Sequence, residues 1–176
     1  MILLKNIYHL ATMNDAGDRL SGVDVLTDGR AISRVGESLE APEGARVIDC
    51  DSMLILPGFV NLHHHFYQTL QRNVPSTQNK KLFDWLTTLY EIWKGLSAEA
   101  VRASTRVAVA ELLLTGCTRS SDQMYVFPEG VDEDLIDVEI AAAHELGMRF
   151  HPTRGSMSRG KSLGGLPPDS VVQGEE

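Results

Sequence analysis

Two histidines spaced one residue apart are the residues most able to do chemistry in this chain. His63 and His65 follow a short apolar stretch that begins after Pro57-Gly58 and is typical of a buried strand. Because residues i and i+2 of a strand point to the same face, the two imidazoles can approach one point, while His64 points the other way. Neutral imidazole is a common ligand of Zn²⁺, Fe and Ni, so the pair is predicted to supply half of a metal site.

The His63-His64-His65 triplet also has a plainer interpretation. On residue type alone it could be a solvated loop cluster, an adventitious nickel binder, or one packed histidine with two exposed neighbours. Its context favours a metal site, because the triplet stands at the C-terminal end of a predicted strand over 59–63. Parallel α/β folds place their chemistry at that end of their strands.

From residue 57 onward the pattern alternates between strands and helices. The spacing predicts strands over 117–121 and 148–153 and an amphipathic helix over 81–94. A second helix is predicted over 98–114, with Ser97 as its N-cap and Gly116 as its left-handed end. A third is predicted over 133–146, capped by Asp132 and ended by Gly147. A loop rich in Gly, Pro and Ser follows over 154–173, as a possible lid or subunit contact. Strands that alternate with helices of this size indicate βαβ units and a parallel sheet.

Residues 1–56 have a different pattern, with short strands and turns. Strands are predicted over 2–7, 23–27, 30–35 and 45–50, and Asp28-Gly29 is a strong signal for a type I′ hairpin. We interpret this region as a small β domain that precedes the alternating region.

Several residues invite a functional interpretation that a structural one can match. Asp122 and Tyr125, just after a predicted strand, could line a pocket or simply cap a loop. Trp85, Tyr90 and Trp93 recur at helical spacing, so a core role is favoured over stacking on a flat ring. The two cysteines, Cys50 and Cys117, are expected to be buried packing residues, and His151 is assigned to the core.

Composition narrows the class of protein. Of the 176 residues, 43% are hydrophobic and 23% are charged, which is typical of a globular protein, and the net charge of −8 argues against binding to a nucleic-acid backbone. We expect no membrane-spanning segment, because no apolar run reaches about 18 residues. Residues 1–5 are too short for a signal peptide, and two cysteines make no disulfide framework, so a cytoplasmic location is expected.

The stretch Pro57-Gly58-Phe59-Val60-Asn61-x-His63-x-His65 resembles the first-strand signature of the amidohydrolase superfamily. Further segments, over 65–72, 116–118, 153–158 and 164–173, resemble the 8-oxoguanine deaminase branch, which is related to guanine deaminases and hydroxytriazine aminohydrolases. The similarity extends from residue 1 to about residue 173. The branch is carried mainly by the segment from Arg154 to Gln173.

The resemblance implies a fold of the α/β class. Residues 57–176 would form the first three βα units of a metal-dependent (β/α)8 barrel, and residues 1–56 would be part of a composite β-sandwich completed by strands from the far C-terminus. Such a barrel typically needs about 250 residues. The chain is therefore expected to be an N-terminal portion in which the barrel is incomplete.

The resemblance also implies a reaction. One divalent metal, Zn²⁺ or alternatively Fe, would be held by His63 and His65, and metal-bound hydroxide would attack the amino-bearing carbon of 8-oxoguanine to give urate and ammonia. Gln68 would bind the purine edge and Arg154 its carbonyl oxygens, unless Gln68 merely begins a helix and Arg154 forms a structural salt bridge. The other ligands and the general acid/base glutamate are expected beyond residue 176, so no catalytic residue is assigned within this chain.

Two alternatives to this interpretation stay open at this point. The enzyme class can be kept with another substrate, namely guanine, a pterin or a hydroxytriazine, because Gln123-Met124-Tyr125 and Glu91 depart from what the branch leads us to expect. A truncated, non-catalytic fragment with exposed barrel edges belongs to another class. The expected partners are a small purine-like substrate and, at full length, a homo-oligomer, without nucleic acid or membrane.

Overall fold

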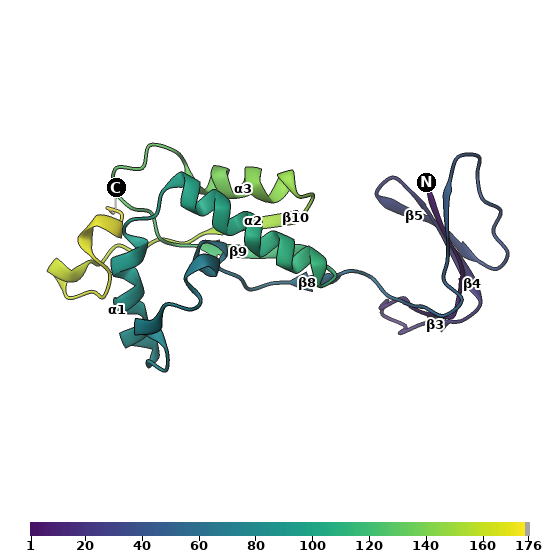
Figure 1. The fold of residues 1–176 in the computed structure, drawn as a ribbon, viewed down its shortest axis with the longest axis horizontal. Helices are drawn as coiled ribbons and strands as arrows, with labels where there is room; N and C mark the ends of the chain where they lie inside the picture. The colour runs from purple at the N-terminus through teal and green to yellow at the C-terminus, as the bar shows by residue number, and fades with distance from the viewer. Residues whose placement is uncertain (175–176) are drawn as a thin grey trace. The chain divides into compact units, whose positions relative to one another are not determined.

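The computed structural model describes residues 1–174 of the chain, and its fold is mixed α/β. The chain divides into two compact units, Met1–Pro57 and Gly58–Glu176 (Figure 1). Of the helices within residues 1–174, none is long and apolar enough to cross a membrane.

The first unit contains two small sheets. A four-stranded sheet has the order β5-β4-β1-β6, with β1 (Ile2–Ile7), β4 (Val23–Asp28), β5 (Ala31–Gly36) and β6 (Arg46–Asp49). The predicted hairpin is confirmed, because β4 and β5 pair antiparallel, but its type I′ turn at Asp28-Gly29 is wrong. Asp28 pairs with Ala31, and of the two loop residues only Gly29 has a positive φ, 57°, which is typical of a type II′ turn. The second sheet, in the order β3-β2-β7, consists of β2 (His9–Ala11), β3 (Arg19–Leu20) and β7 (Leu54–Ile55). The sequence did not predict it, since strands of two or three residues are too short for a periodic pattern.

The second unit is built on a parallel sheet with the order β10-β9-β8, as the alternating pattern predicted. Its strands are β8 (Phe59–Asn61), β9 (Cys117–Met124) and β10 (Arg149–Arg154). The predicted end of the first strand at His63 is wrong, because the side-chain oxygen of Asn61 accepts the backbone N–H of His63 at 3.0 Å and takes that donor out of the ladder. β9 runs three residues further than predicted, paired with β10 up to Met124.

Three α-helices accompany this sheet: α1 (Leu82–Trp93), α2 (Ala98–Leu114) and α3 (Leu135–Glu145). The predicted cap of α2 is confirmed, since Ser97 Oγ accepts the N–H of Ala100 at 3.2 Å. The predicted end is confirmed too, with Gly116 at a φ of 85°. The prediction that Asp132 caps α3 is wrong. Asp134 is the cap, because its Oδ1 accepts the N–H of Ile136 at 2.8 Å and the helix therefore begins two residues later.

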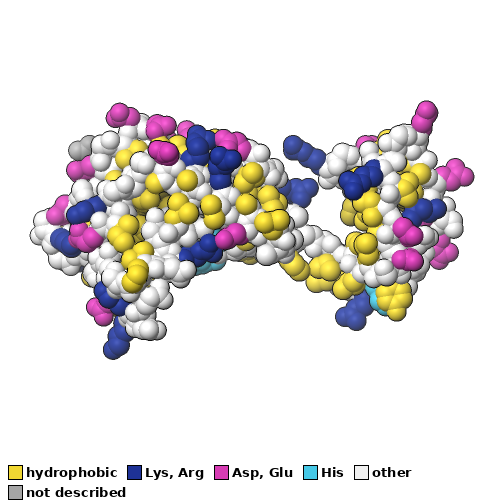
Figure 2. Space-filling model, viewed as in Figure 1, with side chains coloured by type: hydrophobic (Ala, Val, Ile, Leu, Met, Phe, Trp, Pro, Cys, Tyr) yellow, Lys and Arg dark blue, Asp and Glu magenta, His cyan; other side chains and the backbone are white. Residues whose placement is uncertain are grey.

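Short 3₁₀ turns fill the connections of this unit. They span Phe66–Gln71, Pro75–Thr77, Lys161–Leu163 and Asp169–Val171, the last two within the predicted loop 154–173. Glu91 of α1 binds the loop, because its carboxylate pairs with Lys161 as well as with Lys94. On the face shown in Figure 2, acidic and basic side chains are interspersed over the surface.

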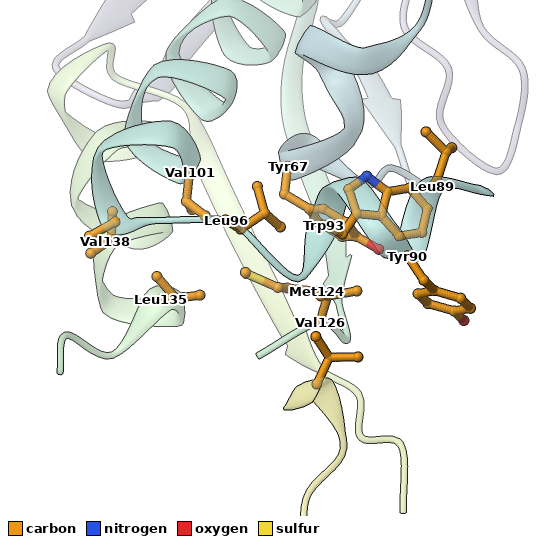
Figure 3. Close-up of a cluster of buried hydrophobic side chains, with 12 residues drawn as sticks. Tyr67, Leu89, Tyr90, Trp93, Leu96, Val101, Met124, Val126, Leu135 and Val138 are labelled. Atoms are coloured by element: carbon orange, nitrogen blue, oxygen red, sulfur yellow. The ribbon is translucent and has the colours of Figure 1, made fainter. Parts of the chain in front are cut away.

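Two hydrophobic clusters support the second unit. The larger joins α1, α2 and α3 to the end of β9 and contains Tyr67, Tyr90, Trp93 and Met124 (Figure 3). The core assignment of Tyr90 and Trp93 is therefore confirmed, and Trp85 packs against the same cluster. The smaller cluster surrounds the fully buried Phe66, whose ring stacks on Phe150 with centroids 5.2 Å apart. Both cysteines are buried as expected. The assignment of His151 to the core is wrong, because it pairs with Ser121, lies on the face of the sheet opposite to Met124, and is exposed.

Candidate metal centre

The structure brings the rings of His63 and His65 together although both residues lie beyond the end of β8. Their ring centroids are 5.1 Å apart and the ring planes are nearly perpendicular, at 88°. His63 is exposed to solvent and His65 is half-buried. The proximity that strand alternation predicted is thus reached by an irregular segment.

The tautomer of His65 is fixed by its surroundings. Nδ1 of this ring lies 2.7 Å from the backbone oxygen of Gln123, and a carbonyl can only accept a hydrogen bond. Nδ1 therefore carries the proton and Nε2 keeps a lone pair, which is the arrangement that metal-ligating histidines generally show. Burial lowers the pKa of His65, with a further lowering from His63, and so favours the neutral ring. These features fit a nitrogen-ligated divalent metal.

His64 is turned toward the helix-covered side of the sheet. Its Nδ1 accepts the backbone N–H of His65 at 2.9 Å, and its ring lies 4.8 Å from that of Phe66. The same nitrogen is 4.0 Å from the carboxylate of Asp122. Burial lowers the pKa of His64 and keeps it neutral. His64 is thus a packing residue that supports the turn and does not join the other two rings.

Residues 64–66, which we call the anchored segment, are held by strand β9 and helix α2. The N–H of Gln123 donates to the backbone oxygen of His64 at 3.0 Å, and the N–H of Phe66 donates to Asp122 Oδ1 at 2.6 Å. The Ser104 hydroxyl donates to the backbone oxygen of Phe66. Each peptide of the segment therefore has a partner from a distant part of the chain.

Asp122 settles one question that the sequence left open. Its side chain is buried, 1% exposed, on the helix-facing side of β9, where it binds a backbone amide and does not line an open pocket. The available signal was its place in the strand, two residues before the core residue Met124 and on the same face.

Gln68 lies beside the histidine pair within a small polar cluster. Its amide Nε2 donates to the hydroxyls of Tyr67 at 3.0 Å and Tyr125 at 3.3 Å. The Tyr125 ring meets His65 edge-on, with centroids 5.4 Å apart. Since both amide N–H groups are engaged, the oxygen of Gln68 is left to accept a hydrogen bond from a ligand. The sequence named Tyr125 only as a possible pocket residue.

Arg154 lies apart from this cluster. It ends β10, and its guanidinium carbon is 4.2 Å from the ring centroid of Phe127. The register pairs Arg154 with Met124, so its side chain leaves the sheet on the helix-facing side. The structure therefore brings His63, His65 and Gln68 together and places Arg154 at the same edge of the sheet but on its other face.

The histidine pair alone does not complete a metal shell. Within residues 1–174 no group of three or more His, Cys, Asp and Glu side chains could hold a metal ion. A four-coordinate zinc site needs at least one further protein ligand. Within residues 1–174, the candidate site thus consists of two imidazoles and a neighbouring amide oxygen.

Comparison with known sequences gives consistent matches. Residues 54–175 match the amidohydrolase family. The chain is 46% identical to an 8-oxoguanine deaminase of Pseudomonas aeruginosa, covering 95% of this chain and 37% of that protein. It is 32% identical to a hydroxydechloroatrazine ethylaminohydrolase of Pseudomonas sp. strain ADP, covering 96% of this chain and 37% of that one.

Comparison of structures leads in the same direction. A zinc complex of an atrazine chlorohydrolase from Arthrobacter aurescens superposes with a TM-score of 0.89 and 34% identity, covering 98% of this chain and 39% of that one. The guanine deaminase of E. coli, at 21% identity, shares the fold with a TM-score of 0.70. The chain thus spans less than two fifths of the length of each of these proteins.

Proposed function

We propose that this chain forms the first part of a metal-dependent hydrolase that removes an amino group from a cyclic amidine. The proposal proceeds from the amidohydrolase family, to which this chain belongs. Residues 58–174 would supply three strands and their helices to a (β/α)8 barrel. The observation that carries the proposal is the histidine pair, in which the contact of His65 Nδ1 with Gln123 leaves Nε2 free for a metal.

His63 and His65 would hold one divalent metal, with zinc as the first choice because both ligands are imidazoles. When bound there, the metal would lower the pKa of a water molecule to about 7 and make hydroxide available near neutral pH. The half-burial of His65 keeps its ring neutral and able to bind. The remaining ligands and the glutamate that moves the proton are proposed to come from outside this chain.

The proposed substrate is 8-oxoguanine. Water would replace the amino group on the ring carbon, so that 8-oxoguanine and water give urate and ammonia. Gln68 suits this ring, because its free amide oxygen can accept from a ring N–H while two tyrosine hydroxyls hold the amide. The 46% identity to an 8-oxoguanine deaminase supports the choice. Arg154 would reach the substrate only after its guanidinium left the face of Phe127.

A second candidate substrate is a hydroxylated triazine. Relatives at 32% and 34% identity act on, or are named for, triazines, and such a ring also carries N–H donors for Gln68. A pterin is a third, because the chain is 29% identical to an isoxanthopterin deaminase. All three rings share an amino-bearing carbon next to ring nitrogen, so the same reaction applies to each.

The test is release of ammonia by the full-length protein from 8-oxoguanine, guanine and isoxanthopterin, and release of ethylamine from hydroxyatrazine, whose amino groups are alkylated. We expect the highest kcat/KM with 8-oxoguanine and loss of activity when zinc is chelated. A higher kcat/KM on hydroxyatrazine would transfer the proposal to the second candidate. No ammonia from the three amino-bearing rings and no ethylamine from hydroxyatrazine, with the zinc content confirmed, would overturn the proposal.

A further inference from the structure

One buried carboxylate lies directly behind the candidate metal ligands. Asp122 Oδ1 accepts the N–H of Phe66 at 2.6 Å, and Phe66 follows His65 in the chain. The peptide that donates this hydrogen bond is the one that joins the two residues, so its orientation sets the direction in which the backbone of His65 continues. A hydrogen bond to a charged acceptor is about twice as strong as one between neutral groups.

A second buried carboxyl lies next to the first. Glu139 of α3 is 0% exposed, and its carboxyl lies beside that of Asp122. Within residues 1–174, neither Glu139 oxygen nor Asp122 Oδ2 has a hydrogen-bond partner. Two buried carboxyls in contact cannot both stay ionised, since each charge lacks solvent and repels the other. Burial accordingly raises the pKa of both groups, so that the pair retains a shared proton.

We propose that Asp122 is a positioning residue for the metal centre, which aims His65 through the Phe66 amide and is itself held in place by Glu139. This inference rests on the proposed metal site. Asp122 touches neither metal nor substrate in this scheme. It fixes the backbone of the anchored segment, while the Gln123 carbonyl of the same strand fixes the ring of His65.

The proposal predicts a graded series at Asp122. Asp122→Ala removes the acceptor and should weaken zinc binding by about 10- to 100-fold, which is typical for loss of a group that orients a metal ligand. Asp122→Asn keeps an uncharged acceptor and should weaken binding by about three- to tenfold, because the hydrogen bond loses its charge assistance. Glu139→Gln can still donate to Asp122 and should stay within about threefold of the wild type.

The measurement is zinc affinity of the full-length protein, in competition with a chromophoric chelator, well below the unfolding temperature. Val138→Ala is the matched control. Val138 is a buried neighbour of Glu139 on α3, and it packs in the larger hydrophobic cluster, whereas Phe66 packs in the smaller one. It should lower the thermal midpoint and leave zinc affinity unchanged, which separates positioning from general destabilisation.

The outcomes separate this inference from the proposed function. If His63→Ala retains the zinc affinity of the wild type, the metal site itself is wrong. If His63→Ala loses zinc while Asp122→Ala stays within twofold of the wild type, only the positioning role of Asp122 is overturned. Should Asp122→Ala fail to fold, Asp122→Asn decides, and unchanged zinc affinity in that folded variant would reject the role.

Discussion

At the C-terminal edge of the sheet β10-β9-β8, the helix-covered face and the open face differ in how their residues are fixed. On the helix-covered face, Asp122, Phe66 and Ser104 are almost fully buried and are joined by direct hydrogen bonds. On the open face, His63 is exposed and Gln68 is only half-buried. The residues that would contact metal and substrate therefore take their positions from groups behind them. Substitutions on the open face should change chemistry, and those on the buried face should change stability or geometry.

The largest expected effect is on the open face. In the full-length protein, His63→Ala or His65→Ala should abolish metal-dependent deamination, a fall of at least about a thousandfold, because each removes one of the two proposed metal ligands of this chain. Bound zinc by atomic absorption and ammonia release check the prediction. His144→Ala, at an exposed position near the end of α3, is the control. Near-normal activity in the double variant would refute the site.

The buried face should respond in stability. Phe66→Ala deletes a fully buried ring that stacks on Phe150, and should destabilise the protein by about 3–5 kcal/mol. Leu62→Ala, at a side chain that is 79% exposed in this unit, should change the free energy of unfolding by less than about 0.5 kcal/mol. Chemical denaturation of the two variants measures the contrast, and similar values for both would remove the distinction between the faces.

The pH dependence of stability should report on Glu139. Burial and the charge of Asp122 raise the pKa of Glu139 to about 9, so the folded state binds more protons than the unfolded state and stability falls as pH rises toward that value. Glu139→Gln removes this group and should flatten the slope between pH 7 and 9 by up to about 1.4 kcal/mol per pH unit. His64 and His65, whose pKa values are lowered by burial, weaken stability only toward acid pH.

Denaturant unfolding of Glu139→Gln and the wild type at pH 7, 8 and 9 gives these slopes. Asp122 is the ionisable neighbour of Glu139, and His64 lies 4.0 Å from Asp122. Both residues are present in the wild type and in Glu139→Gln, so the comparison isolates Glu139. Equal slopes would show that Glu139 is ionised in the folded protein.

The smallest effect is expected at Tyr125. Tyr125→Phe removes one of the two hydroxyls that hold the Gln68 amide, which is worth about 1 kcal/mol, so KM for 8-oxoguanine should rise several-fold with little change in kcat. Tyr8→Phe, at an exposed position of the first unit, should leave both constants unchanged. A fall in kcat with an unchanged KM would argue against a role in holding the amide.

Local patterns predicted much of the fold. The helices carry long periodic signals and their ends carry specific chemistry, so Ser97 and Gly116 were identified as they occur. The cap of α3 lies at Asp134 and not at the predicted Asp132, because Asp134 Oδ1 accepts the N–H groups of Ile136 and Asp137. Strand ends were less accurate, because pairing with a distant strand, not local sequence, decides how far β9 extends.

The candidate site was predictable only in part. The spacing of His63 and His65 is a local feature, so the sequence alone identified the pair as candidate metal ligands. The direction of Arg154 depends on its register with Met124, and the role of Asp122 depends on contact with Phe66, 56 residues earlier. Neither relation leaves a trace in a single sequence.

The contacts of the anchored segment determine when the histidine pair can become ordered during synthesis of the protein. His65 precedes its partner Gln123 by 58 residues. At about 5–20 residues per second, the ribosome adds this stretch in roughly 3–12 seconds, so the histidines are synthesised seconds before the strand that aims them. During that interval the two histidines lack the contacts that strand β9 provides. The ordered site belongs to the late stage of synthesis, and zinc captured earlier would be bound by two flexible side chains.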